Sequence, residues 1–337
     1  MSLFIEKTKK IKGKNTISEM KYLIINGSRQ FLLIRSEDIN NPIVLFIHGG
    51  PGSSEAVFFN HYNGKLESNY TLVNWDQRQS GKSYSFIKKE KSLSIKQYVN
   101  DLIFLAEYLT KTYNQEKINI IAHSWGSLIG LLAIKRRPDL FEKYIGVGQV
   151  SNMIESENNS YDYVMSEAKK NKNQKAVREL EKIGRPVNGV YKNGYKGTKI
   201  QRKWLRHYKG AFHKEKLMKE LTQIAIKSME YNFVSNIKMI FSTNDEARNK
   251  MLINEFLCYN LENKITIYET PIYFFLGKYD NQISSENAKR YFDKIKAPVK
   301  KLIWFEKSGH APCFEESKIF NQKVIEVLES GPTTALT

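Results

Sequence analysis

The sequence predicts an α/β fold: a mostly parallel central sheet with helices on both faces and an inserted helical segment. Short apolar runs of strand length alternate with segments of helix length through the first 150 residues. The alternation stops near Ser151, where a polar stretch with mostly helical spacing follows, and sheet-type sequence resumes at PIYFFLG (271–277). Continuous apolar strands that alternate with helices are typical of a parallel sheet covered on both faces.

The N-terminal half supplies a hairpin and then alternating strands and helices. The runs YLIIN (22–26) and QFLLIR (30–35) flank Gly27-Ser28-Arg29, which predicts a hairpin. Further strands are expected at IVLFI (43–47), YTLVNW (70–75), INIIA (118–122) and KYIGVG (143–148). Helices are expected at 94–113 and 128–136, the first because its apolar residues recur at spacings of three and four.

The C-terminal part completes the sheet. After PIYFFLG we expect a helix around 284–295, the strand KLIWF (301–305) and a closing helix from 315 to about 329. The length of 337 residues fits two units, or one large domain with an insertion. We therefore expect a core made of residues 1–150 and 266–337, interrupted by a helical cap at residues 151–265.

Composition excludes several classes of protein. Hydrophobic residues make up 41% of the chain and aromatic residues 12%, which excludes intrinsic disorder and a collagen-like fibre. Two cysteines, Cys258 and Cys313, are too few for a disulfide scaffold and fit a reducing compartment, so we expect a cytoplasmic protein. The net charge of +18 leaves three explanations open, namely a polyanionic partner, an acidic substrate or a lysine-rich proteome.

The charge is concentrated in the predicted insertion. Residues 151–250 hold 21 Lys and Arg against 11 Asp and Glu, a net of +10. The 17 residues between Lys117 and Lys135 carry no charge, but Gly126 and several polar side chains mark a turn within them. We interpret them as a buried strand followed by a buried helix, and we expect no membrane span and no signal peptide.

A candidate nucleophile lies at that turn. Ala122-His123-Ser124-Trp125-Gly126 follows a predicted strand directly and precedes a predicted helix. A strand–turn–helix elbow of this kind needs small residues two places before and two places after the nucleophile, and it exposes the serine above the sheet. Serine needs a base that is itself oriented by a carboxylate.

The partners of Ser124 are expected after later strands, in the order serine, acid, histidine. Asp280 follows PIYFFLG in GKYD, and His310 follows KLIWF in SGHAP, so both lie at the carboxyl ends of strands, on the same rim as Ser124. The other histidines fit this role less well, because they flank other motifs, lie in an early loop or belong to the basic insertion.

An oxyanion hole is expected from main-chain amides. The loop His48-Gly49-Gly50-Pro51-Gly52 leaves the strand IVLFI and can supply one donor, and the amide of Trp125 supplies the other. The loop lacks the Lys-Ser/Thr ending and the spacing of a phosphate cradle. No H-E-x-x-H pattern is present, and we expect neither a metal nor a cofactor.

These motifs resemble the proline iminopeptidase-like branch of the α/β-hydrolase superfamily. HGGPG (48–52), DQRQSGKS (76–83), AHSWGS (122–127), GKYD (277–280) and SGHAP (308–312) occur in that order. The resemblance implies a helical cap after the sixth strand, a Ser124–Asp280–His310 triad, and oxyanion donors from Gly50 and Trp125. It also implies that cap carboxylates hold the amino group of the substrate. The predicted cap contains Glu155, Glu157, Glu167 and Glu230 among others, but no motif matches any one of them to this role.

Two positions depart from the pattern of the branch, and one motif has a structural interpretation. Ala122 and Gln79 stand where the branch has glycine. We interpret Asp76-Gln77-Arg78 as support for the loops beneath the site rather than as catalytic residues.

The favoured function is a serine hydrolase acting on an amide or ester of a small molecule or short peptide. Aminopeptidase activity leads, and carboxylesterase activity is the alternative. A non-catalytic protein that binds nucleic acid through its basic cap is the minority alternative, because Tyr191, Tyr195, Trp204 and Tyr208 lie among basic residues. The spacing of Trp204 and Tyr208 equally fits a buried helix face, and we expect no nucleic acid partner. No pattern indicates the oligomeric state.

Overall fold

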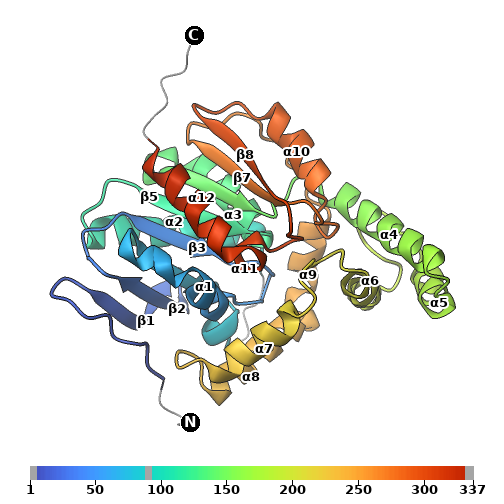
Figure 1. Ribbon diagram of the computed structural model, residues 1–337, viewed down its shortest axis with the longest axis horizontal. Helices are drawn as coiled ribbons and strands as arrows, with labels where there is room; N and C mark the ends of the chain where they lie inside the picture. The colour runs from blue at the N-terminus through green and yellow to red at the C-terminus, as the bar shows by residue number, and fades with distance from the viewer. Residues whose placement is uncertain (1–5, 88–92, 331–337) are drawn as a thin grey trace.

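An eight-stranded sheet forms the centre of the molecule (Figure 1), in a computed structural model that describes residues 6–87 and 93–330. The strands run in the order β1-β2-β4-β3-β5-β6-β7-β8. Pairing is antiparallel between β1 and β2 and between β2 and β4, and parallel from β4 onward. The predicted α/β class with a mostly parallel sheet is confirmed. The strands are β1 (Ile17–Ile25), β2 (Ser28–Ser36), β3 (Ile43–Ile47), β4 (Thr71–Asp76), β5 (Ile118–His123), β6 (Phe141–Val147), β7 (Ile272–Gly277) and β8 (Lys300–Phe305).

Alternate residues of the buried strands face two separate apolar layers. In β3, Leu45 and Ile47 belong to one core cluster, whereas Val44 and Phe46 belong to the other. The first cluster includes residues of α2 (Ile95–Thr112), α3 (Trp125–Arg136) and α10 (Ser285–Lys294). The second includes residues of α1 (Ala56–Asn63), α11 (Pro312–Glu315) and α12 (Ser317–Glu329), which lie on the near side of the sheet in Figure 1. Burial on both faces explains why these strands are continuously apolar.

The N-terminal hairpin turns earlier than predicted. The turn is formed by Asn26 and Gly27, not by Gly27-Ser28-Arg29, and Ser28 already pairs with Ile25. Both turn residues have positive φ, 44° for Asn26 and 76° for Gly27. Such angles are typical of the tight two-residue turn that Asn-Gly favours, because this turn matches the twist of the flanking strands.

Helices α4 to α9 lie between β6 and β7, within the predicted 151–265. Helices α4, α5 and α6 share an apolar cluster of their own, which includes Val164, Leu180 and Leu205, whereas α7 and α9 pack into the two clusters of the sheet. Figure 1 shows α4 and α5 extending away from the sheet, with α7 and α8 below α1. Their bounds are α4 (Met153–Lys170), α5 (Gln174–Ile183), α6 (Tyr195–His207), α7 (Leu217–Lys227), α8 (Phe233–Asn244) and α9 (Glu246–Leu257). We call residues 153–257 the helical insertion.

The segment 210–214 joins the helical insertion to two loops of the sheet. The carbonyl oxygen of Gly210 accepts a hydrogen bond from the amide of Asn281 at 2.8 Å, and that of Ala211 accepts one from the amide of His310 at 2.7 Å. The Glu315 carboxylate accepts hydrogen bonds from the amides of His213 and Lys214 at 2.6 and 3.0 Å. The loops after β7 and β8 are therefore held by the same short stretch of the insertion.

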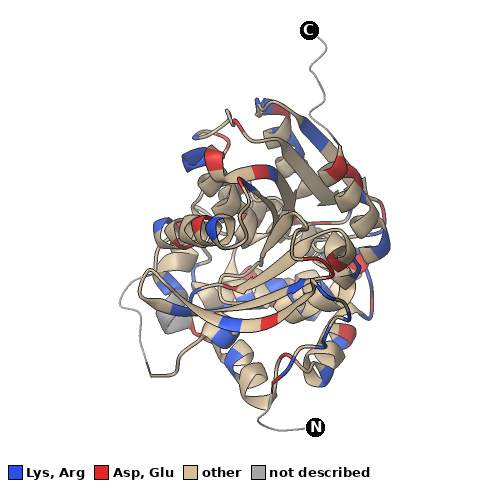
Figure 2. Cartoon of the chain, turned by 90° about the vertical axis from the view of Figure 1, so that its left-hand side faces the viewer, with Lys and Arg blue, Asp and Glu red and all other residues tan. Residues whose placement is uncertain are grey.

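Basic residues are interspersed with acidic ones over the side of the molecule that Figure 2 shows. In the helical insertion, Arg185 pairs with Asp162 at 2.7 Å and Lys203 with Glu179 at 2.6 Å. Part of the positive charge of the insertion is therefore compensated by neighbouring carboxylates. Among the described residues, no helix has the length and apolar composition needed to cross a bilayer.

Candidate active site

Ser124 lies at a sharp turn between β5 and α3. Its φ and ψ are 52° and −120°, a region that non-glycine residues rarely adopt and that costs about 1–3 kcal/mol. The amide of Ser124 donates to the carbonyl of Val147 at 2.9 Å, which fixes the turn against β6. A Cβ on Gly126 would come within 2.3 Å of the carbonyl oxygen of Ile47, so this position requires glycine. Ala122 is fully buried, and its methyl group fits within the elbow.

The three predicted residues Ser124, Asp280 and His310 form one chain of hydrogen bonds. His310 Nε2 lies 2.8 Å from Ser124 Oγ, and His310 Nδ1 lies 2.7 Å from Asp280 Oδ2. All three side chains belong to residues that are at most 6% exposed. A carboxylate accepts the hydrogen on Nδ1, which leaves the lone pair of Nε2 facing the serine hydroxyl. This is the arrangement in which an imidazole takes a proton from serine.

Asp280 is held as a carboxylate by its surroundings. Its second oxygen accepts the amides of Gln282 and Ile283 at 2.9 and 3.1 Å. Burial alone would raise the pKa of Asp280, but His310 and the two amides outweigh it and hold the pKa below its ordinary value. The carboxylate is therefore ionised at neutral pH and keeps the imidazole oriented.

The predicted oxyanion donors are Gly50, in the loop that contacts Ser124, and Trp125, the residue after it. Gly50 has a φ of +125° and precedes Pro51 through a cis peptide bond, and a Cβ there would meet the amide nitrogen of Gly52 at 2.7 Å. A Cβ on Gly49 would lie 3.3 Å from the Cβ of Ser124, so the loop passes directly over the serine. Neither the Gly50 nor the Trp125 amide donates to another residue within the described ranges, 6–87 and 93–330.

The remaining motif residues form a layer behind the oxyanion loop. His48 Nδ1 donates to the Gly49 carbonyl at 2.7 Å, and its Nε2 accepts the amide of Gln77 at 3.1 Å. Burial lowers the pKa of His48, so the ring is neutral. The Gln77 side chain donates to the His48 carbonyl at 2.7 Å and accepts from the indole of Trp125 at 3.0 Å. Gln77 therefore connects the loop that carries Gly50 to the residue after the nucleophile.

Asp76 and Arg78 do not pair with each other. Asp76 accepts hydrogen bonds from Ser54 Oγ at 2.5 Å, from the amide of Lys82 at 2.7 Å and from the hydroxyl of Tyr231. Burial raises the pKa of Asp76, although these hydrogen bonds oppose the rise. Ser54 belongs to the stretch that follows Gly52, and Tyr231 belongs to the helical insertion.

Gln79, one of the two departures from the branch pattern, adopts a left-handed conformation. Its φ is 57°, an angle that glycine reaches more readily than glutamine. The loop therefore keeps the conformation expected of glycine while it carries a long side chain.

A chamber of about 570 Å³ adjoins the triad. Its floor includes His123, Gln282 and Ala311, close along the chain to Ser124, Asp280 and His310. The walls from the helical insertion are mainly apolar and include Phe212, Met218, Leu221, Ala225, Ile226, Met239 and Ile240. Its lining also includes the carboxylate of Glu55 and the guanidinium of Arg206.

The four carboxylates of the helical insertion named in the sequence analysis do not line this chamber. Glu155 pairs with Arg290 at 2.6 Å, and Glu157 pairs with Arg202. Glu167 lies near Lys170, and Glu230 accepts hydrogen bonds from Thr8 and Ser228. The acid that does line the chamber is Glu55. Nothing in the local sequence around Glu55 indicates its partners or a role in the site.

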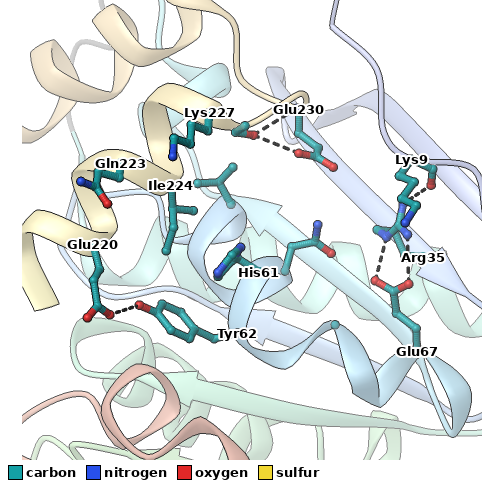
Figure 3. Close-up of a pocket in the computed structure, with 14 residues that line it drawn as sticks. Lys9, Arg35, His61, Tyr62, Glu67, Glu220, Gln223, Ile224, Lys227 and Glu230 are labelled. Carbon is teal, nitrogen blue, oxygen red and sulfur yellow. Dashed lines mark hydrogen bonds and ion pairs between the residues drawn. The ribbon is translucent and has the colours of Figure 1, made fainter.

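A second cleft of about 820 Å³ lies apart from the triad (Figure 3). It is formed by α1, α7 and the N-terminal segment, and its lining includes Lys9, His61, Glu220 and Lys227. Its charged side chains are of both signs, and several of them already pair with each other or with neighbours, as Arg35 does with Glu67 at 2.7 Å. Ser124, Asp280 and His310 line neither cavity, but the chamber is lined by residues within two positions of each of them, whereas this cleft is not.

Comparison with known proteins assigns the geometry to a family. The sequence profile of the alpha/beta hydrolase fold matches residues 42–317. A Bacillus subtilis (strain 168) protein named probable aminopeptidase YbaC is 32% identical over 320 residues, which cover 92% of this chain and 96% of that protein. The chain belongs to the α/β-hydrolase fold family.

Solved structures of α/β hydrolases agree with this assignment. A proline iminopeptidase-related protein from Thermus thermophilus superposes with a TM-score of 0.65 at 16% identity, over 93% of this chain and 97% of that one. The proline iminopeptidase of Mycobacterium smegmatis has a TM-score of 0.63 at 12% identity, over 92% of this chain and 97% of that one. At such identities the likeness concerns the fold. The predicted membership in the α/β hydrolases is confirmed, and two of the structures that superpose on this fold carry proline iminopeptidase names. The described residues contain no group of His, Cys, Asp and Glu that is arranged to hold a metal ion.

Proposed function

We propose that this α/β hydrolase is a serine hydrolase that acts without a cofactor and works through an acyl-enzyme. The observation that carries the proposal is the chain of hydrogen bonds from Ser124 through His310 to Asp280, at 2.8 and 2.7 Å. These distances lie within the range that proton transfer between nucleophile and base requires.

The reaction follows from the positions of these groups. Ser124 Oγ attacks the carbonyl carbon of the substrate while its proton passes to His310 Nε2, and Asp280 stabilises the resulting imidazolium. The negative charge that develops on the carbonyl oxygen is stabilised by the amides of Gly50 and Trp125. His310 then gives its proton to the leaving amine or alcohol, and the acyl group stays on Ser124. Water, deprotonated by His310, releases the acid and restores the serine.

The helical insertion serves as a cap in this proposal, with residues 151–265 closing over a core of residues 1–150 and 266–337. It is supported by the chamber beside the triad, whose walls come largely from α7 and α8. A chamber of about 570 Å³ suits a small molecule or a short peptide rather than a folded protein.

Aminopeptidase activity on short peptides is the leading proposal for the substrate, and the name of the Bacillus relative supports it. Carboxylesterase activity is the second candidate, and the chamber favours it. Its lining is mainly apolar, and none of the four predicted insertion carboxylates reaches it to hold a substrate ammonium. The two proposals therefore differ in whether a free amino group on the substrate is recognised.

Nucleic acid binding through the helical insertion has less support. Tyr191 and Trp204 are buried, with 2% and 6% of their surfaces exposed, and belong to the apolar cluster of the insertion. Trp204 stacks on Tyr208 with ring centroids 6.2 Å apart. These rings pack within the insertion instead of being offered to bases. Within the proposal, the enzyme acts in the cytoplasm on a small substrate.

A fluorophosphonate probe tests the mechanism. We expect the probe to label Ser124 in the wild-type protein and not in Ser124→Ala, and hydrolysis to be lost in the same variant. Absence of labelling, or full activity in Ser124→Ala, would disprove the serine mechanism. A panel of aminoacyl p-nitroanilides, including proline, set against p-nitrophenyl esters then separates aminopeptidase from esterase activity.

A further inference from the structure

Two side chains beside the triad, Glu55 and His123, have no part in the mechanism above. Glu55 lies directly before α1, and His123 is the last residue of β5, next to Ser124 in the chain. Nδ1 of His123 lies 3.0 and 2.9 Å from the two carboxylate oxygens of Glu55. The side chain of His123 is 4% exposed and that of Glu55 is 14% exposed, so the pair is largely shielded from water.

The contacts of His123 fix its protonation state. Its Nε2 lies 3.0 Å from the main-chain carbonyl oxygen of His310, which accepts hydrogen bonds and cannot donate one. Nδ1 faces Glu55, and Glu55 Oε2 also accepts the amide of Gly49 at 2.9 Å. With acceptors at both nitrogens, the ring donates from both, and His123 is an imidazolium paired with a carboxylate.

The electrostatic surroundings agree with this state. Burial alone would lower the pKa of His123, but Glu55 and the His310 carbonyl outweigh it and raise the pKa. Burial alone would raise the pKa of Glu55, but His123 and the Gly49 amide outweigh it and lower the pKa. The other titratable groups that act on the pair are His48 and Cys313 on the Glu55 side, and Asp280 on the His123 side. Burial keeps His48 and the Cys313 thiol neutral, since it lowers the pKa of the former and raises that of the latter.

We propose that His123 and Glu55 are positioning residues for the serine hydrolase reaction, an inference that rests on the function proposed above. The pair connects the Gly49 amide, through Glu55 and His123, to the main-chain carbonyl of His310. One end of this connection is the loop that carries the oxyanion donor Gly50, and the other is the loop that carries the base. Ser124 lies between them, so the ion pair sets the distance between oxyanion donor and base across the nucleophile.

The pair also has an electrostatic consequence that a purely structural role would lack. The ring centroids of His123 and His310 lie 5.0 Å apart. A positive charge at this distance opposes the protonation of His310, whereas a negative charge favours it. His123→Asn leaves the Glu55 carboxylate alone, so the acidic limb of the kcat/KM profile should move to higher pH. Glu55→Gln removes the carboxylate that raises the pKa of His123; wherever the ring still holds its proton, its positive charge is uncompensated, and the limb should move to lower pH. Each shift should be about one pH unit.

The experiment compares His123→Asn, Glu55→Gln and the double variant with the wild-type protein. The matched controls are His61→Asn and Glu37→Gln, which make the same exchanges at exposed positions outside the site. For each protein the kcat/KM profile against pH, the rate of fluorophosphonate labelling and the thermal unfolding midpoint are measured. We expect labelling about tenfold slower in both single variants, limb shifts of opposite sign, and controls that match the wild-type protein.

The outcomes separate this inference from the function on which it rests. If the wild-type protein is not labelled at Ser124, the serine mechanism fails and this inference fails with it. If the wild-type protein is labelled but the two single variants react at its rate, or their acidic limbs move in the same direction, only the positioning role is overturned. Should a variant not fold, NMR of the His123 ring in the wild-type protein decides. The imidazolium should persist at pH values where a free imidazole has lost its proton, and a neutral ring there overturns the inference.

Discussion

Arg78 and Asp101 form an ion pair in the interior of the protein. The guanidinium Nε lies 2.8 Å from Asp101 Oδ2, and the two residues are 1% and 0% exposed. Asp101 also accepts hydrogen bonds from Asn26 and Gln30, both at 2.9 Å. The pair thereby connects the N-terminal hairpin, the loop after β4 and α2, and the motif residue Arg78 supports the sheet from behind the site.

Replacing Asp101 should strongly lower the free energy of unfolding. Asp101→Asn removes the charge of the carboxylate that Arg78 binds in the interior, and breaking a buried ion pair typically costs about 3–5 kcal/mol. Urea denaturation followed by circular dichroism measures the loss in free energy of unfolding. The matched control is Asp162→Asn, which removes the exposed pair with Arg185 and should cost less than about 1 kcal/mol. Equal effects at the two positions would contradict the assignment.

The two small residues of the elbow, Gly126 and Ala122, should differ in how well they tolerate substitution. Gly126→Ala places a methyl group 2.3 Å from the carbonyl oxygen of Ile47, and the backbone must move to accommodate it. We expect the variant to lose fluorophosphonate labelling of Ser124 and to be destabilised by about 2 kcal/mol or more. Ala122→Gly, the glycine of the branch pattern, should keep its labelling and cost about 0.5–1 kcal/mol through backbone entropy. A fully labelled Gly126→Ala variant would show that the elbow has room for a side chain.

The stability of the folded protein should fall at acidic pH because Asp280 becomes protonated. The pKa of this buried carboxyl is held low in the folded protein by His310 and two amides, against the effect of burial, and lies near 3.9 in an unfolded chain. Its contribution to stability is therefore present above about pH 4 and lost as the pH falls through the folded pKa. Asp280→Asn should be less stable than the wild-type protein at pH 6 and should lose less of its stability on acidification. Urea titrations between pH 6 and 3 test this, and parallel losses in the two proteins would refute it.

Arg206 should make the chamber select for anionic groups. It lines the chamber without an ion-pair partner among the described residues, while neighbouring Arg202 is paired with Glu157. Desolvation of the guanidinium and the charge of Arg202 lower the pKa of Arg206, while the residue as a whole is exposed and so accessible to a substrate. Arg206→Gln should raise KM about tenfold for a p-nitrophenyl ester whose acyl chain ends in a carboxylate, and leave KM for the neutral ester unchanged.

The control for Arg206 is Lys203→Gln, one turn away on α6. Lys203 is exposed and paired with Glu179 at 2.6 Å. Its replacement should leave both values of KM unchanged. If Arg206→Gln raised KM equally for the acidic and the neutral ester, the residue would shape the chamber rather than select charge.

The sheet could be predicted because its strands carry their signal locally. Val44, Leu45 and Phe46 are apolar without interruption since both faces of β3 are buried, and the same holds for Ile120, Ile121 and Ala122 in β5. The order of Ser124, Asp280 and His310 also follows from the positions of the strands along the chain. Helix α1 was not predicted: His61 and Asn63 break its apolar pattern, and its cap residue Glu55 makes no side-chain hydrogen bond that would mark the helix start.

What the sequence could not indicate were pairings between distant segments. Asp101 lies 23 positions from Arg78, and Glu55 lies 68 positions from His123. No local pattern brings such residues together, because their contact depends on how the sheet orders its strands. The same reason explains why the partners of the insertion carboxylates could not be predicted. Glu155, for example, pairs with Arg290, 135 positions away.

The segment 210–214 has a consequence for how substrate reaches the chamber. Its carbonyl oxygens hold the amides of Asn281 and His310, so a movement that lifted this stretch would also pull apart the acid and the base. Opening of the whole insertion as one rigid body would therefore break these two hydrogen bonds. We expect substrate to enter where α7 and α8 meet the core. The segment 210–214 would stay in place and hold the loops of Asp280 and His310 at a constant separation.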